Sequence, residues 1–190
     1  MRAFVALELP EDVRRALGGV QCRLAASQAD VKWVTVAHLH LTLKFLGEIT
    51  EEQRVQVTRL LEALASTTAP LRLRLTDLGS FPTQGAARVL WVGAEDETQQ
   101  LPRLAGELER GLASLACGER EEEFVAHVTL GRVRSSRNRA NLIRQLAEVT
   151  WTPPPSFAVP GVTLMHSVLS STGSTYTPLA QLPFSGGQVG

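Results

Sequence analysis

Hydrophobic residues recur with two different periods along this chain. In residues 39–46 and 124–131 they form short runs that alternate with polar side chains, and a glycine ends or directly follows each run. Short alternating runs bounded by glycine are typical of β-strands. Both segments contain the pattern His-x-Thr-Leu, at residues 40–43 and again at 127–130. We therefore predict two strands that carry the same tetrapeptide.

Strand geometry places the polar residues of each tetrapeptide together. Successive side chains of a strand point to opposite faces, so residues two apart share a face. His40 and Thr42 are then neighbours on one face of the first strand. His127 and Thr129 are neighbours on one face of the second. Each strand should offer one imidazole and one hydroxyl, backed by apolar side chains.

Other segments show the helical period, with apolar residues three and four apart. The spacing predicts four helices: one opening at Pro10, one after a capping box formed by Thr50 and Gln53, one over Leu101–Leu115, and one capped by Ser136 or Asn138. Further strands are predicted at 3–9, 31–36, 71–75, 88–93, 157–159, 161–169 and 176–182.

The predicted elements repeat in order. Strand, helix, motif strand, helix and strand occur in the first half and again in the second, with similar spacing from Phe4 to His40 and from Val89 to His127. Such a repeat indicates an internal duplication. Two copies related by approximate two-fold symmetry would face each other across a shared cleft. We expect the boundary between lobes near residues 79–85.

Composition describes an ordinary globular protein. Of the 190 residues, 44% are hydrophobic and 20% charged, and the formal net charge is zero. A generally basic nucleic-acid coat is excluded, so an anionic ligand would need a local patch of positive charge. Cys22 and Cys117 are expected to be unpaired thiols. Glu8 and Pro10 interrupt the apolar N-terminal run, so we expect neither signal peptide nor membrane span, and a cytoplasmic location.

The paired motifs suit phosphoryl chemistry. The ordinary histidine pKa of ~6.5 allows proton transfer in either direction near neutral pH. Two histidines on opposite sides of a substrate can act as general acid and general base, and threonine hydroxyls can donate hydrogen bonds to phosphate oxygens. In-line displacement at phosphorus needs groups on both sides, and this arrangement supplies them without a metal or other cofactor.

Three alternatives compete with this interpretation. A single histidine in an apolar strand is usually structural, although the duplicated motif argues against that. A zinc site is disfavoured, because the chain has four histidines and no cysteine or carboxylate shares a motif's histidine face. A non-catalytic module that binds RNA or nucleotide phosphates is the third, but binding alone does not require two titratable groups.

Positive charge gathers after the second motif. Five arginines lie between residues 132 and 144, and no acidic residue occurs from Phe124 to Ala147. They are either phosphate ligands or part of a solvated helix start. Strict alternation puts Arg132 on the wrong face, so it reaches the site only if the strand bends near Gly131. Lys44 should share the face of His40.

The sequence resembles the two-histidine phosphoesterase superfamily, and most closely its RNA 2′,3′-cyclic phosphodiesterase branch, also called 2′-5′ RNA ligase. The similarity runs over nearly the whole chain. It rests on the opening residues 2–7, on 32–34, on 38–48, on His127-Val128-Thr129-Leu130-Gly131-Arg132, and on the late pattern Ser167…Gly173…Tyr176. Ala126 stands where that family usually has proline.

The resemblance implies a single α+β domain of two pseudo-symmetric lobes, with antiparallel sheets lining a central cleft and helices outside. We place lobe one at residues 1–80, lobe two at 81–184 and a flexible tail at 185–190. The implied reaction is hydrolysis of RNA 2′,3′-cyclic phosphate ends to 2′-phosphates by a monomer without cofactors, with weak reverse 2′-5′ ligation. A small cyclic nucleotide or a 2′-5′ oligonucleotide is the alternative substrate.

The resemblance also implies residue roles. His127 would be the proton acceptor and His40 the proton donor, whereas the sequence pattern alone leaves the two interchangeable. Thr42, Thr129 and Arg132 would bind the phosphate. Lys44 and Tyr176 are further candidates for substrate contact. Four aromatic residues are candidates for stacking on a base, and each is otherwise a core or rim residue: Trp33, Phe45, Phe81 and Tyr176. His38 is expected at the rim of the site, and His166 is expected to be structural.

Overall fold

The computed structural model describes residues 1–83, 85–119, 123–169 and 174–187. In chain order its elements are β1 (Arg2–Glu8), α1 (Glu11–Ala25), β2 (Val31–Trp33), the 3-10 turn η1 (Val36–His38), β3 (His40–Glu48), α2 (Glu51–Thr67), β4 (Leu71–Phe81), β5 (Val89–Asp96), α3 (Leu101–Ser114), β6 (His127–Val133), α4 (Arg139–Glu148), β7 (Phe157–Val159), β8 (Gly161–Leu169) and β9 (Ser174–Pro183). The acidic run at 119–123 predicts a solvated loop and the Ser- and Gly-containing segment at 170–174 predicts a turn, and both segments fall largely outside the described residues.

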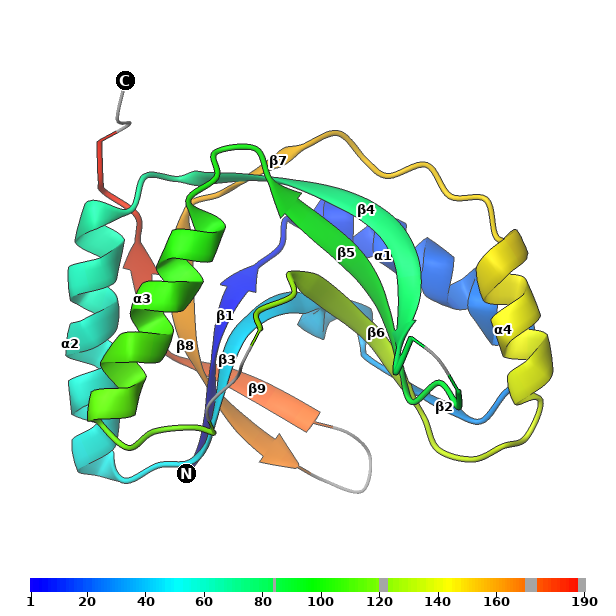
Figure 1. The fold of residues 1–190 in the computed structure, drawn as a ribbon, viewed down its shortest axis with the longest axis horizontal. Coiled ribbons are helices and arrows are strands. Elements are labelled where there is room, and N and C mark those ends of the chain that lie inside the picture. The colour runs from blue at the N-terminus through cyan, green and yellow to red at the C-terminus, as the bar shows by residue number, and fades with distance from the viewer. Residues whose placement is uncertain (84, 120–122, 170–173, 188–190) are drawn as a thin grey trace.

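The strands form one strongly curled sheet in the order β7-β4-β5-β6-β3-β1-β8-β9, with β2 added beside β6. Neighbouring strands pair antiparallel, which confirms the α+β class. The two halves of the sheet meet at a single pair, Leu41 opposite Val128. The helices lie outside, with α2 and α3 at one end of the molecule and α1 and α4 at the other (Figure 1).

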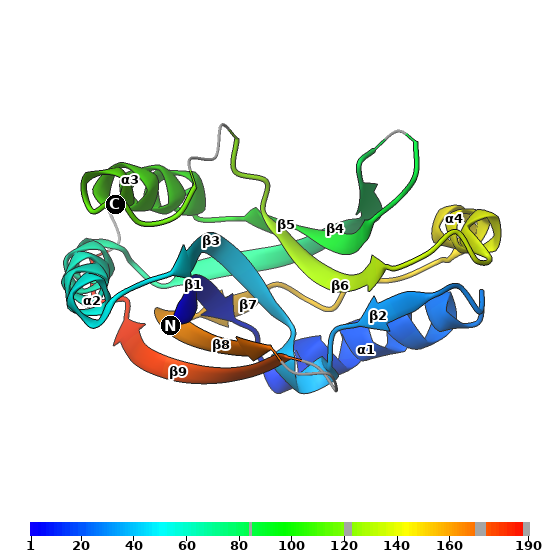
Figure 2. The same ribbon diagram turned by 90° about the horizontal axis from the view of Figure 1, so that it is seen from below.

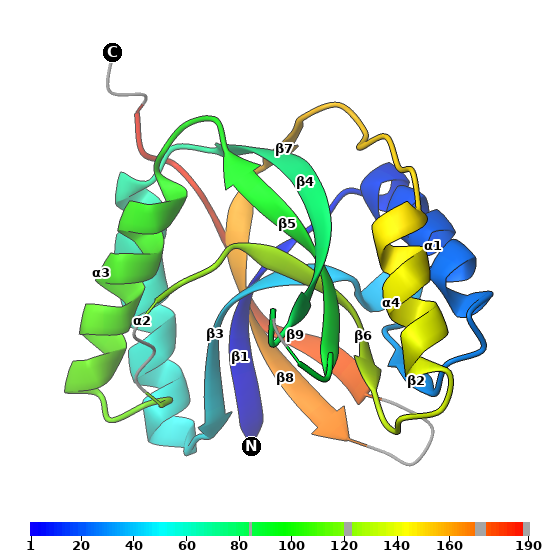
Figure 3. The same ribbon diagram turned by 45° about the vertical axis from the view of Figure 1, so that its right-hand side comes forward.

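The two halves of the chain are intertwined, so each half of the sheet contains strands from both sides of the predicted boundary near residue 80. β4 lies before that boundary but pairs with β5, and β8 lies in the second half but pairs with β1. The half-sheets are therefore β7-β4-β5-β6 and β3-β1-β8-β9, related by a pseudo-two-fold axis (Figure 3). Each covering helix pair also takes one helix from each repeat. Strand exchange of this kind depends on pairing between distant segments, which local periodicity does not report.

A local signal explains where α2 begins. Thr50 Oγ1 accepts a hydrogen bond from the backbone N–H of Gln53 at 3.1 Å, and the Gln53 side chain accepts one from the Thr50 N–H at 3.0 Å. This is the predicted capping box at the start of α2. No helix in the described part of the chain is both long and apolar enough to span a membrane.

Several predicted boundaries change. The strand expected over 31–36 ends at Trp33, and the strand expected over 124–131 is shifted to His127–Val133. Part of the expected flexible tail is anchored instead: Ser185 N–H donates to the Ala65 carbonyl at 3.0 Å and Gly186 N–H to the Thr68 carbonyl at 2.9 Å. Residues 188–190 lie outside the described residues.

Candidate active site

The two His-x-Thr segments lie side by side at the junction of the half-sheets. Because β3 and β6 run antiparallel through the pair Leu41 and Val128, their flanking residues approach crosswise. His40 is placed beside Thr129, and Thr42 beside His127. The two imidazoles and two hydroxyls thus form a quartet (His40, Thr42, His127, Thr129) around the pseudo-two-fold axis. Leu41, Val128 and Leu130 point the other way and are fully buried.

Both histidines are oriented in the same manner. His40 Nδ1 lies 2.7 Å from the His38 carbonyl oxygen, and His127 Nδ1 lies 2.7 Å from the Val125 carbonyl oxygen. A carbonyl oxygen only accepts, so Nδ1 carries the proton in each ring. The catalytic proton must then be exchanged at Nε2. In His40, Nε2 lies 3.1 Å from Thr42 Oγ1, where it accepts from the hydroxyl when the ring is neutral.

Aromatic rings hold each imidazole in place. The His40 ring stacks on Phe4 with 4.9 Å between centroids, and the edge of Tyr176 meets it at 5.4 Å. The His127 ring meets Phe81 at 5.2 Å and Trp91 at 6.3 Å, both edge to face. Burial against these rings lowers the pKa of His40, and the charge of nearby His38 lowers it further. The hydrogen bond to the His38 carbonyl and the Glu8 carboxylate oppose this shift. Neutral His40 is thereby favoured in the free protein.

A cleft of about 780 Å³ opens over three members of the quartet, His40, Thr42 and Thr129. Six of the candidate residues line it, namely His40, Thr42, Phe45, Thr129, Arg132 and Tyr176, together with a wall that includes Arg2, Phe4, Glu119, Ser167 and Ser174. His127 is not part of this lining. It lies at the adjoining end, two residues before Thr129 on the same face of β6.

A β-bulge brings Arg132 into the cleft. In the pairing of β5 with β6, Trp91 lies opposite Thr129 but Leu90 lies opposite Gly131, so one extra residue is inserted in β6. Leu130 and Gly131 are both buried, and the alternation resumes one residue late. Arg132 therefore shares the face of Thr129. The bulge supplies the bend near Gly131 that Arg132 needs to reach the site.

The matching bulge in β3 removes Lys44 from the cleft, which corrects the prediction that it shares the face of His40. Thr42 lies opposite Ala6 while Lys44 lies opposite Val5, so β3 also holds an extra residue. The Lys44 side chain is only 3% exposed, and its Nζ lies 2.7 Å from Glu109 Oε2 in α3. It also donates to the Glu119 carbonyl. Phe45 takes the cleft position instead and is 51% exposed.

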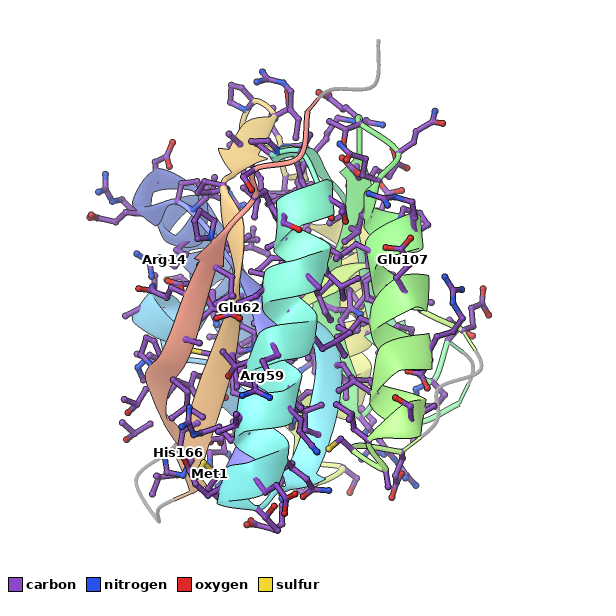
Figure 4. The ribbon with its side chains drawn as sticks, turned by 90° about the vertical axis from the view of Figure 1, so that its left-hand side faces the viewer. Met1, Arg14, Arg59, Glu62, Glu107 and His166 are labelled. Carbon is purple, nitrogen blue, oxygen red and sulfur yellow. The ribbon has the colours of Figure 1, made fainter. Side chains whose placement is uncertain are left out.

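Other candidates divide between site and scaffold. Trp33 packs against the core, and His38 contacts Tyr176 at 5.1 Å near the cleft. His166 lies in β8 opposite Ala3, toward the lower end of that strand in Figure 4 and outside the cleft lining. The contribution of Phe4 was missed from the sequence, because its position under His40 depends on the register between β1 and β3. Among the described residues, no group of three or more His, Cys, Asp or Glu is placed to hold a metal ion.

Comparison with known proteins agrees with this geometry. The LigT-like phosphoesterase family model matches the chain twice, over residues 7–91 and 92–176, with one motif in each match. An RNA 2′,3′-cyclic phosphodiesterase of Thermus thermophilus is 35% identical, covering 98% of this chain and 91% of that protein. One of Methanothermobacter thermautotrophicus is 31% identical over 94% and 96% of the two chains.

Solved structures show the same fold. A protein of Thermus thermophilus superimposes with a TM-score of 0.82 at 33% identity, covering 98% of this chain and 99% of that one. E. coli LigT in complex with 3′-AMP gives a TM-score of 0.78 at 28% identity, covering 97% and 98%. The duplication and the resemblance inferred from the two motifs are thus confirmed.

Proposed function

The chain belongs to the LigT-like phosphoesterase family, and we propose that it hydrolyses RNA 2′,3′-cyclic phosphate ends to 2′-phosphates with its two histidines as acid and base. The observation that carries this proposal is the quartet: two imidazoles with Nδ1 bound to a carbonyl, each beside a threonine hydroxyl, next to an arginine. Relatives named RNA 2′,3′-cyclic phosphodiesterase, 31–35% identical over nearly the full chain, support the substrate.

The proposed reaction is an in-line displacement at phosphorus. His127 Nε2 takes a proton from water while the water oxygen bonds to phosphorus. The bond from phosphorus to the 3′ oxygen breaks, and His40 Nε2 gives its proton to that oxygen. The products are a 2′-phosphate and a 3′-hydroxyl. Thr42, Thr129 and Arg132 donate hydrogen bonds to the non-bridging oxygens, where negative charge must be held. The same groups in reverse would join RNA ends through a 2′-5′ bond.

The protonation of His40 needs the substrate. An acid must carry a proton at Nε2, yet burial lowers the pKa of His40 in the free protein. A phosphodiester anion bound beside the ring favours the imidazolium, since an opposite charge within a few ångströms raises a histidine pKa. His40 would therefore take up a proton as the anion binds, and Thr42 would then accept from Nε2 or turn to the phosphate.

We also propose that the protein acts as a monomer in the cytoplasm. The quartet is complete within one chain, so the proposed reaction needs no residue from a second copy. Cys22 and Cys117 are free thiols, which fits a reducing compartment.

Incubation with cytidine 2′,3′-cyclic monophosphate in the presence of EDTA tests the proposal. We expect turnover, with the product phosphate on the 2′ oxygen, as located by ³¹P NMR. A 3′-phosphate product would mean that the other oxygen leaves, which contradicts the assigned roles. Loss of turnover in EDTA would indicate a metal enzyme. Binding without turnover, of both this nucleotide and a cyclic-phosphate oligonucleotide, would indicate a phosphate-binding module.

A further inference from the structure

One wall of the cleft carries exposed cations beyond the phosphate site. Strand β2 pairs with β6 so that Lys32 lies opposite Arg132. The flanking residues Val31 and Trp33 point away from the cleft, because a Cβ added to Gly131 would meet their side chains at 2.7 and 3.0 Å. Lys32 therefore shares the cleft face with Arg132, and both side chains are exposed.

The positive charge continues toward α4. Arg134 directly follows β6, two residues beyond Arg132, and its guanidinium binds Asp30 Oδ1 through Nε at 3.0 Å and a terminal nitrogen at 2.9 Å. The pKa of the Asp30 carboxyl is lowered, first by a hydrogen bond from Ser135 and then by Arg134, with a contribution from the charge of Arg137. The Asp30 carboxylate is thus held by Ser135 and Arg134, and 63% of the Arg134 side chain stays exposed.

Acidic residues are distributed unequally between the two walls. Residues 31–34 and 127–139 contain no Asp or Glu, although the chain as a whole has as many acidic as basic residues. The opposite wall, formed by the far ends of β1 and β3, combines Arg2 and the N-terminal ammonium with Glu48 and Glu119, and that ammonium lies 3.2 Å from Glu48 Oε2. An anionic chain that leaves the quartet is therefore attracted more strongly along β6 than along β3.

We propose that Lys32, Arg134 and Arg137, here called the basic track, bind the backbone phosphates of the RNA nucleotides that precede the cyclic end. The track continues from Arg132 along β2 and β6 to the start of α4, elements that lie side by side at one end of the molecule (Figure 2). This inference rests on the proposed function, because the terminal phosphate must occupy the quartet. Cations that track a backbone bind single strands with little sequence preference.

The test compares two substrates. Values of kcat/KM are measured for adenosine 2′,3′-cyclic phosphate and for a four-nucleotide RNA with the same end, at several salt concentrations. We expect the tetranucleotide to be preferred by about tenfold or more at low salt. Its log kcat/KM should also fall more steeply with log salt, by about 0.7 for each additional phosphate contact. Equal kcat/KM for the two substrates would overturn the track.

Charge reversal locates the effect. Lys32→Glu and Arg137→Glu should each lower the ratio of tetranucleotide to mononucleotide kcat/KM by roughly fivefold and flatten the salt dependence. The matched control is Arg59→Glu, an exposed arginine on the outer face of α2, away from the cleft (Figure 4). That control should keep the wild-type ratio.

The outcomes are distinct. An unchanged ratio in Lys32→Glu and Arg137→Glu, or an equal fall in Arg59→Glu, would contradict the track. An equal loss on both substrates would mean that these residues serve the quartet and not the upstream strand, which also overturns it. Absence of turnover by the wild type on both substrates would instead refute the proposed function.

Discussion

The strands β3 and β6 start from the same tetrapeptide and the same backbone irregularity, yet they deliver different groups to the cleft. In each, a bulge follows the threonine, so the third residue after it returns to the cleft face. That residue is Phe45 in β3 and Arg132 in β6. The residue just before it is Lys44 in one strand and Gly131 in the other. Both copies of the duplicated unit have the bulge, but the side chain that it directs to the cleft differs.

The cross-strand neighbours of the histidines differ as well. Glu8 lies opposite His40, where its carboxylate accepts from Thr163 Oγ1 at 2.6 Å and from the Gln181 amide at 3.0 Å. The residue opposite His127 is Gly93, which has no side chain. Of these two cross-strand neighbours, only Glu8 carries a charge, and it acts on His40. Pseudo-symmetric histidines can therefore take unequal roles, with the carboxylate on the side of the proposed acid.

Removal of either imidazole should produce the largest loss. His40→Ala and His127→Ala should each lower kcat by about 10²–10⁴-fold, because each removes one proton-transfer group. An aryl phosphodiester, whose leaving group needs no protonation, separates the two roles. It should restore much of the lost rate in His40→Ala and little in His127→Ala. The opposite pattern would mean that His40 is the base and His127 the acid. As a control, circular dichroism should show that both variants are folded.

Lys44 and Gly131 differ in how each bulge is packed. Lys44→Ala removes a buried ammonium from Glu109. We expect the free energy of unfolding, measured by urea titration, to fall by about 3 kcal/mol. This is the lower end of the range for a buried ion pair, because Glu109 is partly exposed.

Gly131→Ala should lower the free energy of unfolding by about 1–3 kcal/mol in the same titration, since the new methyl group would crowd Val31.

A double-mutant cycle provides the control for the ion pair. The double variant Lys44→Met/Glu109→Gln should lose less stability than the sum of the losses in Lys44→Met and Glu109→Gln. Each single change leaves one charge facing a neutral side chain, whereas the double change removes both charges. Strict additivity would show that Lys44 and Glu109 do not interact energetically.

Arg132→Ala should lower kcat/KM by about 10–100-fold, since hydrogen bonds to a charged group contribute roughly 1.5–3 kcal/mol. The loss should occur on every cyclic phosphate, with or without a base, because the arginine is assigned to the phosphate. Arg132→Lys should recover part of the activity, as one charge remains but the forked geometry is lost. Equal activity of Arg132→Ala and wild type would remove Arg132 from the site.

Phe45→Ala should have a smaller effect, about tenfold and mainly on KM, because one base stacked on an aromatic ring contributes about 1–3 kcal/mol. Phe45→Trp should keep the wild-type KM. An abasic ribose 2′,3′-cyclic phosphate should not distinguish Phe45→Ala from wild type. A loss on that substrate as well would show that Phe45 supports the strand and not the base.

Glu8→Gln should give the smallest effect, below about fivefold at neutral pH, because Glu8 is exposed and such charges contribute about 1 kcal/mol or less. The carboxylate raises the pKa of His40, so its removal should lower that pKa further. For an acid that must be protonated, the fall of kcat/KM with rising pH should then begin at lower pH. NMR titration of His40 gives the same shift directly, and Glu95→Gln serves as the control.

Local sequence signals were sufficient for much of the fold. The helical period located all four helices of the described chain, and the pair Thr50 and Gln53 marked the start of α2 by hydrogen bonds between residues three apart. Alternation correctly paired His40 with Thr42 and His127 with Thr129 on one face, because side-chain direction in a regular strand depends on position alone. The duplicated motif also identified the family.

Only the tertiary structure decided what lies beyond each threonine. Strict alternation placed Lys44 on the cleft face and Arg132 on the opposite face. In the structure Lys44 is buried against Glu109, and Arg132 lines the cleft. The reason is the bulge, which arises from hydrogen-bond register with β1 and β5, strands distant in sequence. The same non-local pairing exchanged β4 and β8 between the halves and set Glu8 beside one histidine and Gly93 beside the other.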